Sequence, residues 1–127
     1  MKSQFNRAFS LLEVLIAVGI LSVAVITIFR SFTACLSAAR FSQHISLASF
    51  LAEEKIFEIE QAYAKNLVIE DYGLTSLAST NFNWHYEILD TQDEDLKELK
   101  FIVSWKENQR EQEYPMEFLT YLPVKQQ

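Results

Sequence analysis

The feature that most constrains this chain is an apolar stretch from Phe9 to Phe29 whose only charged residue is Glu13. As a helix it would extend about 31 Å, which is enough to cross a hydrocarbon core of about 30 Å. Small residues such as Gly19 and Ser22 interrupt it, and membrane helices tolerate them. We therefore expect residues 9–29 to form a transmembrane helix.

Three simpler interpretations compete with a dedicated function for this stretch. A secretory signal peptide also has a basic start, but its apolar region is shorter, about 7–15 residues. A lipoprotein signal would need Phe32-Thr33-Ala34-Cys35 to act as a lipobox, although Arg30 separates it from the apolar run. Cys35 is better interpreted as a small helix residue. A plain single-pass anchor explains everything except Glu13.

Glu13 is costly inside an apolar helix, so it indicates a partner or a position near the interface where it can reach water. If the chain were cut between Ala8 and Phe9, a new ammonium would appear four residues from Glu13. That cation could neutralise the carboxylate within one subunit or from a neighbouring copy.

The run from Arg7 to Ala17, RAFSLLEVLIA, resembles the processing site of type IV pilin-like precursors. The resemblance implies that residues 1–8 are a basic leader, removed by a prepilin peptidase between Ala8 and Phe9, and that Phe9 is then N-methylated. Ala8 stands where the family usually has Gly. The resemblance further implies that Glu13 serves in subunit assembly.

Beyond Arg30 the helical pattern becomes amphipathic and continues to about residue 65, without proline or glycine. One face carries an apolar stripe, and its members recur at steps of three and four: Phe41, Ile45, Ala48, Ala52, Ile56, Ile59 and Tyr63. We expect residues 30–65 to be the second half of the helix and to pack on the rest of the chain.

Residues 66–127 are predicted to form a small β head. Asn66 to Asn83 lacks periodicity and is interpreted as a loop. Alternating apolar residues then predict three strands, around Trp84–Ile88, Leu99–Trp105 and Met116–Leu122. Short links between them favour an antiparallel meander. The expected fold class is therefore α+β, a long N-terminal helix packed on an antiparallel sheet of about three strands.

The small head, the Trp84-led strand and the run Leu99-x-Phe101-x-Val103-x-Trp105 most resemble the I-type minor pseudopilins of type II secretion. This resemblance implies a structural subunit at the tip of a pseudopilus, which nucleates assembly for export of folded proteins. It implies other minor and major pseudopilins and the inner-membrane assembly platform as partners. The chain would be single-pass in the inner membrane, with a cytoplasmic N-terminus and a periplasmic head.

The orientation and the alternatives depend on this resemblance. Lys2 and Arg7 favour a cytoplasmic N-terminus, whereas Arg30 and Arg40 weaken that orientation, and the resemblance restores it. A minor type IV pilin for adhesion, motility or DNA uptake stays open. So does a single-pass membrane protein that binds partners without forming a filament.

Composition and residue spacing argue against other classes of function. The net charge of -6 disfavours nucleic-acid binding, which needs clustered cations. His44, His85 and Cys35 show no spacing typical of a catalytic or metal site, so we expect no enzymatic activity, cofactor or metal. Asp90 to Asp95 is acidic enough for calcium but does not match an EF-hand loop, and a solvated turn is favoured.

Overall fold

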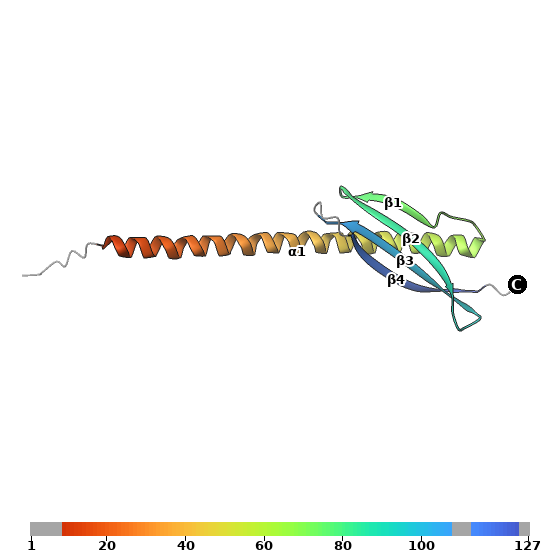
Figure 1. The fold of residues 1–127 in the computed structure, drawn as a ribbon. Helices are drawn as coiled ribbons and strands as arrows, with labels where there is room; N and C mark the ends of the chain where they lie inside the picture. Colours follow the sequence, from red (N-terminus) through yellow and green to blue (C-terminus); the bar gives the residue numbers. More distant parts are fainter. Residues whose placement is uncertain (1–8, 108–112, 125–127) are drawn as a thin grey trace, which may run out of the picture. The chain divides into compact units, whose positions relative to one another are not determined.

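The computed structural model describes residues 9–107 and 113–124. The elements follow in the order α1 (Leu11–Lys65), β1 (Tyr72–Leu77), β2 (Thr80–Asp90), β3 (Leu96–Lys106) and β4 (Glu113–Pro123). The fold is α+β, a long N-terminal helix packed on a four-stranded antiparallel sheet, which confirms the predicted class (Figure 1). The chain divides into two compact units, one ending at Arg40 and one beginning at Phe41.

Both ends of α1 are closed by side chains or turns that satisfy free backbone groups. At the start, the backbone N–H of Glu13 donates to Ser10 Oγ at 3.2 Å, so Ser10 is the N-cap. At the end, Asn66 adopts a φ of 55°. The N–H groups of Asn66 and Leu67 then donate to Tyr63 O and Ala62 O, the Schellman arrangement. Local sequence therefore sets both helix boundaries.

The first unit is the part of α1 up to Arg40. All its described side chains are exposed, and its apolar residues meet no other part of the unit. By length and composition, α1 contains one stretch near the N-terminus that could cross a membrane, with a mean hydropathy of 2.7. This agrees with a single-pass membrane anchor in the predicted region.

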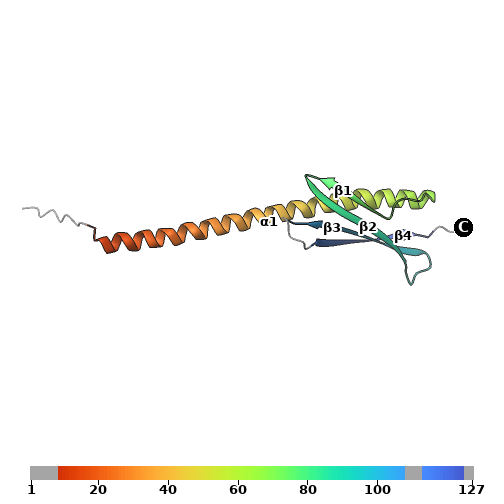
Figure 2. The same cartoon turned by 45° about the horizontal axis from the view of Figure 1, so that its top comes forward.

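In the second unit the four strands form an antiparallel meander in the order β1-β2-β3-β4. Figures 1 and 2 show the end of α1, residues 41–65, lying along one face of this sheet. The register places Trp84 opposite Val103, and Val103 opposite Met116. The three predicted strands and their alternation are thus confirmed, with β2 and β3 longer than their apolar runs.

The prediction of a loop from Asn66 to Asn83 was wrong for most of its length, because β1 and the start of β2 lie there. β1 joins β2 through a two-residue turn, Ala78-Ser79, with φ angles of 48° and 65°. Tight hairpins of this kind usually carry Asn or Gly, which tolerate positive φ. Ala and Ser give no such signal, so the hairpin was missed.

The core lies between residues 41–65 of α1 and the inner face of the sheet. It is built from a small set of buried side chains, namely Ala48, Leu51, Ala52, Ile59, Phe82, Leu99, Phe101, Val103, Trp105 and Leu122. The predicted helical stripe supplies Ala48, Ala52 and Ile59 to it, and Ile45, Ile56 and Tyr63 pack at its edge. Leu51, only 1% exposed, belongs to the core although the stripe omitted it.

Trp84 holds the short strand β1 to the sheet. Its indole lies over Gly73, where an added Cβ would sit only 2.5 Å from Trp84 Cζ2. Trp84 Nε1 donates to Thr75 Oγ1 at 3.1 Å, and its ring stacks on Phe101 with centroids 5.9 Å apart. Gly73 is therefore required by close packing rather than by its backbone angles.

Candidate processing and assembly site

Phe9 and Glu13, which the sequence predicted to take part in processing and assembly, lie at the start of α1. Phe9 directly precedes the N-cap Ser10 and is 78% exposed, and Glu13 lies in the first helical turn. Ala8, the predicted residue before the cut, lies outside the described residues. On the described side of that bond, Phe9 and Ser10 are exposed and precede the first residue of the helix.

Ser10 and Glu13 fit the capping pattern Ser-x-x-Glu, which sequence reasoning missed although its spacing was visible. Only the backbone N–H of Glu13 takes part in the hydrogen bond with Ser10 Oγ. An acid in the first turn also interacts favourably with the positive end of the helix dipole, by roughly 0.3–1 kcal/mol. The Ser10 cap itself does not use the Glu13 carboxylate, which stays available for another partner.

Phe9 and Glu13 lie on one side of the helix, beside a shallow and mainly apolar groove. Its lining follows a helical spacing: Phe9, Glu13, Val14, Ala17, Val18 and Leu21. Glu13 is the only charged member of this set. In the part of the chain that the structure describes, its carboxylate makes no hydrogen bond or ion pair. An apolar groove with one unpaired carboxylate at its end suits a helix that brings a cation.

The head contains a polar cluster that the sequence did not predict. His44 on α1 contacts Glu107 Oε2 through Nδ1 at 2.8 Å and Thr80 Oγ1 through Nε2 at 3.3 Å. The indole N–H of Trp105 donates to the same Glu107 oxygen at 3.3 Å. The imidazole thus bridges α1, the start of β2 and the end of β3. We interpret the cluster as a tertiary link, because Glu107 is shared between two donors.

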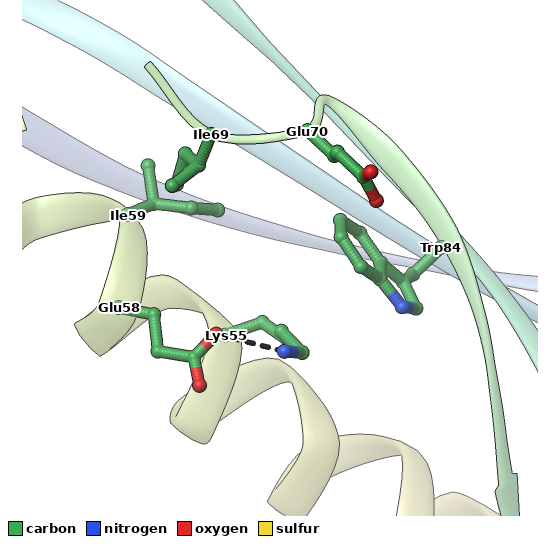
Figure 3. Close-up of a pocket in the computed structure, with 6 residues that line it drawn as sticks. All are labelled: Lys55, Glu58, Ile59, Ile69, Glu70 and Trp84. Carbon is green, nitrogen blue, oxygen red and sulfur yellow. Dashed lines mark hydrogen bonds and ion pairs between the residues drawn. The ribbon is translucent and has the colours of Figure 1, made fainter. Parts of the chain in front are cut away.

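A small pocket of about 210 Å³ opens between α1 and the segment leading into β1 (Figure 3). Its one cation, Lys55, pairs with Glu58 at 2.7 Å and lies 5.4 Å from the centroid of the Trp84 ring. Ile59, Ile69 and Glu70 complete the lining. Lys55 is thus held between the Glu58 carboxylate and the Trp84 ring.

The acidic connection between β2 and β3 is organised as a hydrogen-bonded turn. Thr91 Oγ1 donates to Leu96 O at 2.7 Å and accepts from the N–H of Asp93, and Asp93 Oδ1 accepts from the N–H of Asp95. Asp90 pairs with Lys97 at 3.2 Å. Among residues 9–107 and 113–124, no three His, Cys, Asp or Glu side chains are placed to hold one metal ion.

The other candidates lie apart from these features. His85 is exposed on the outer face of β2, and Cys35 is exposed on α1 within the first unit. Burial, and then the nearby Asp71 carboxylate, raise the pKa of the Tyr86 phenol above its usual value.

Comparison with known families identifies the start of the chain. The family model for the prokaryotic N-terminal methylation motif matches residues 4–29, which include Phe9 and Glu13. No curated protein and no solved structure is significantly similar to the chain. The motif supports a type IV pilin-like precursor, and it implies processing by a prepilin peptidase and association with a membrane.

Proposed function

We propose that the chain is a minor pseudopilin of a type II secretion system. It would be anchored in the inner membrane by residues 9–29, with the leader 1–8 removed and the head, residues 66–127, in the periplasm. Its role would be structural rather than enzymatic: it would nucleate the tip of a pseudopilus together with other minor subunits. The observation that carries this proposal is the methylation motif at a capped, exposed helix start whose Glu13 carboxylate is unused by that cap.

Further support comes from the size and order of the elements. A membrane-capable helix continues without a proline or glycine break into residues 41–65, which pack on a four-stranded meander. Among the described residues, the second unit consists of this one helix–sheet core and the connections between its strands. The proposed role therefore relies on surfaces that meet other subunits.

Processing is the first test of the proposal. In cells that contain a prepilin peptidase, the mature chain should begin at Phe9 with a methylated amine. Loss of Lys2 and Arg7 would change the formal charge from -6 to -8. Intact-mass and N-terminal analysis of the membrane-extracted protein decides it. A mature chain that keeps Met1, or that carries lipid on Cys35, would contradict the proposal.

Glu13 separates assembly from simple anchoring. In a lone anchor, Glu13→Leu should insert at least as well as the wild type, because a costly polar group is removed. In an assembly, the change leaves the terminal ammonium of a subunit without its partner, a loss of roughly 3–5 kcal/mol for a buried pair. We expect Glu13→Leu to be processed and inserted yet to lose crosslinking to fellow subunits and secretion. Glu13→Gln should be impaired less.

A matched control keeps composition and charge unchanged. In the double variant Leu12→Glu, Glu13→Leu the carboxylate moves by one residue, about 100° around the helix. Because the Ser10 cap uses a backbone N–H, both variants should keep the helix start. We expect the moved carboxylate not to restore crosslinking. Wild-type crosslinking in Glu13→Leu would refute the assembly role of Glu13.

The two alternatives make different predictions. A minor type IV pilin would be processed in the same way, but its deletion would impair piliation, adhesion or DNA uptake and leave protein secretion intact. A membrane protein without a filament would keep residues 1–8. Parallel secretion and piliation assays of a deletion strain, complemented with the full chain, distinguish the three.

A further inference from the structure

The two edges of the sheet differ in their capacity to accept another strand. β1 and β4 are the outermost strands, so each exposes one row of backbone groups. In an antiparallel ladder, every second residue directs its N–H and C=O away from its neighbour. One backbone hydrogen bond beyond the end of each ladder shows which residues of β1 and of β4 direct these groups outward.

On β4, the outward positions are blocked. The N–H of Val124 donates to Asp95 O at 2.8 Å, so Val124 and every second residue before it face β3. The outward positions are therefore Glu113, Pro115, Glu117, Leu119, Tyr121 and Pro123. Both prolines of the chain fall in this set, and a proline has no N–H to offer. Two further positions carry carboxylates, and charges together with prolines are how natural sheets protect an edge.

On β1, no residue that the structure describes blocks the edge. The N–H of Tyr86 donates to Asp71 O at 2.9 Å, so Asp71 and every second residue after it face β2. Tyr72, Leu74 and Ser76 point outward, and all three retain their N–H and carry no charge. Among the described residues, no backbone group pairs with them. Tyr72 and Leu74 are 72% and 65% exposed, so apolar side chains flank the open edge.

The edge is also rigid enough to act as a template. Trp84 fixes the inner side of β1 through Gly73 and Thr75, and the Ala78-Ser79 turn fixes its end. A strand that is held in place has no ordering cost of its own when a partner pairs with it. β1 therefore combines free hydrogen-bonding groups, exposed apolar contacts and a fixed backbone.

We propose that the outer edge of β1 binds an extended segment of a different protein, which pairs antiparallel with Tyr72–Ser76 and enlarges the sheet. Charge specifies the partner further. Glu70 and Asp71 precede β1, and no Lys or Arg occurs from residue 66 to residue 96. An antiparallel partner places its C-terminal end beside these acids. The segment should therefore alternate uncharged strand-forming residues and end in a basic residue.

A second copy of this chain fits the edge less well. Its own β4 edge is blocked, so the antiparallel pairing proposed above would have to join β1 of one copy to β1 of the other. β1 runs alongside residues 41–65 of α1 in roughly the opposite direction (Figures 1 and 2). Such a pair would therefore reverse one copy's helix relative to the other. If the proposed function holds, copies are anchored in one membrane with their helices in the same direction, so they could not form this reversed pair.

The test uses the full chain in detergent micelles and a fluorescent peptide, Thr-Val-Thr-Val-Thr-Val-Arg. We expect saturable binding, which Leu74→Pro weakens by about tenfold or more, because this change removes an outward N–H without breaking the β1–β2 ladder. Glu117→Pro, at an outward position of β4, should bind the peptide like the wild type. Fluorescence anisotropy measures the affinity, and tryptophan emission checks that both variants keep the Trp84 environment.

A peptide control needs no protein variant. The same peptide with N-methyl groups on all its Thr and Val residues has no row of N–H groups on either edge of its strand and should not bind; replacing its Arg by Glu should weaken binding severalfold. Equal binding of the methylated peptide, or of Leu74→Pro, would overturn the proposal. A second result would also overturn it: sedimentation experiments that show the chain to dimerise, with the dimer lost in Leu74→Pro. In that case β1 would pair with β1 of another copy rather than with a different protein. Because no processing or secretion is measured, failure here leaves the Phe9 and Glu13 tests unaffected.

Discussion

Gly73→Ala tests the packing that holds β1 in the sheet. The new Cβ would lie 2.5 Å from Trp84 Cζ2 and 2.7 Å from Cε2, so the indole must move. Its hydrogen bond to Thr75 is worth about 1 kcal/mol, and its stacking on Phe101 about 0.5–1.5 kcal/mol. Replacing a glycine in a strand returns roughly 0.5–1 kcal/mol. We expect a net loss of about 0.5–2 kcal/mol in the free energy of unfolding.

The measurement is urea denaturation of a soluble chain that begins at Arg30, followed by circular dichroism and tryptophan fluorescence. Ser76→Ala, on the same strand but exposed, is the matched control and should change stability by less than about 0.5 kcal/mol. In a Trp84→Phe background, the smaller ring leaves room for the methyl group, so Gly73→Ala should cost little. An equal cost in both backgrounds would refute the reasoning, because the clash would then not be with Trp84.

Two more predictions concern the second unit. Ile56→Asp should lower the free energy of unfolding by about 2–4 kcal/mol in the same denaturation assay, because it places a charge against the core. Phe57→Asp, at a side chain that is 61% exposed, should leave stability nearly unchanged. Similar losses in both variants would mean that the buried face of the helix is misassigned. Burial and Asp71 raise the pKa of Tyr86, so folding favours its neutral phenol. The stability that this raised pKa contributes to the folded state is fully present below about pH 10. It is lost as the pH rises through the pKa that Tyr86 has in the folded protein. Tyr86→Phe should flatten this alkaline decrease in thermal unfolding curves, and an unchanged pH profile would contradict the assignment.

The helix, the fold class and most of the sheet could be predicted because each has a strong local pattern. The apolar run from Phe9 to Phe29 and the three- and four-residue steps of the stripe indicate one long helix. The alternation from Leu99 to Trp105 indicates a central strand, and that strand proved to supply four core residues. In these regions, hydrophobic periodicity and burial agree, so the sequence is informative without tertiary knowledge.

The remainder depends on contacts between distant residues. β1 is short, contains a glycine and ends in a turn without Asn or Gly, so local propensity does not identify it. Gly73 is explained only by the Trp84 ring from the neighbouring strand. The hydrogen bond between His44 and Glu107 joins residues far apart in sequence, and no local sequence pattern around either residue predicts it. The N-terminal methylation motif could be predicted because it is contiguous in sequence.

The placement of the core also bears on how the head folds. Neighbouring strands are consecutive in sequence, so the sheet itself has low contact order and can form hairpin by hairpin. The helix packs differently, because Ala48 and Leu51 belong to the same core as Leu122 near the end of β4. Helix docking therefore completes only after β4 has been synthesised. Until then the apolar stripe stays uncovered, and a chain that stalls before β4 would expose it to chaperones and proteases.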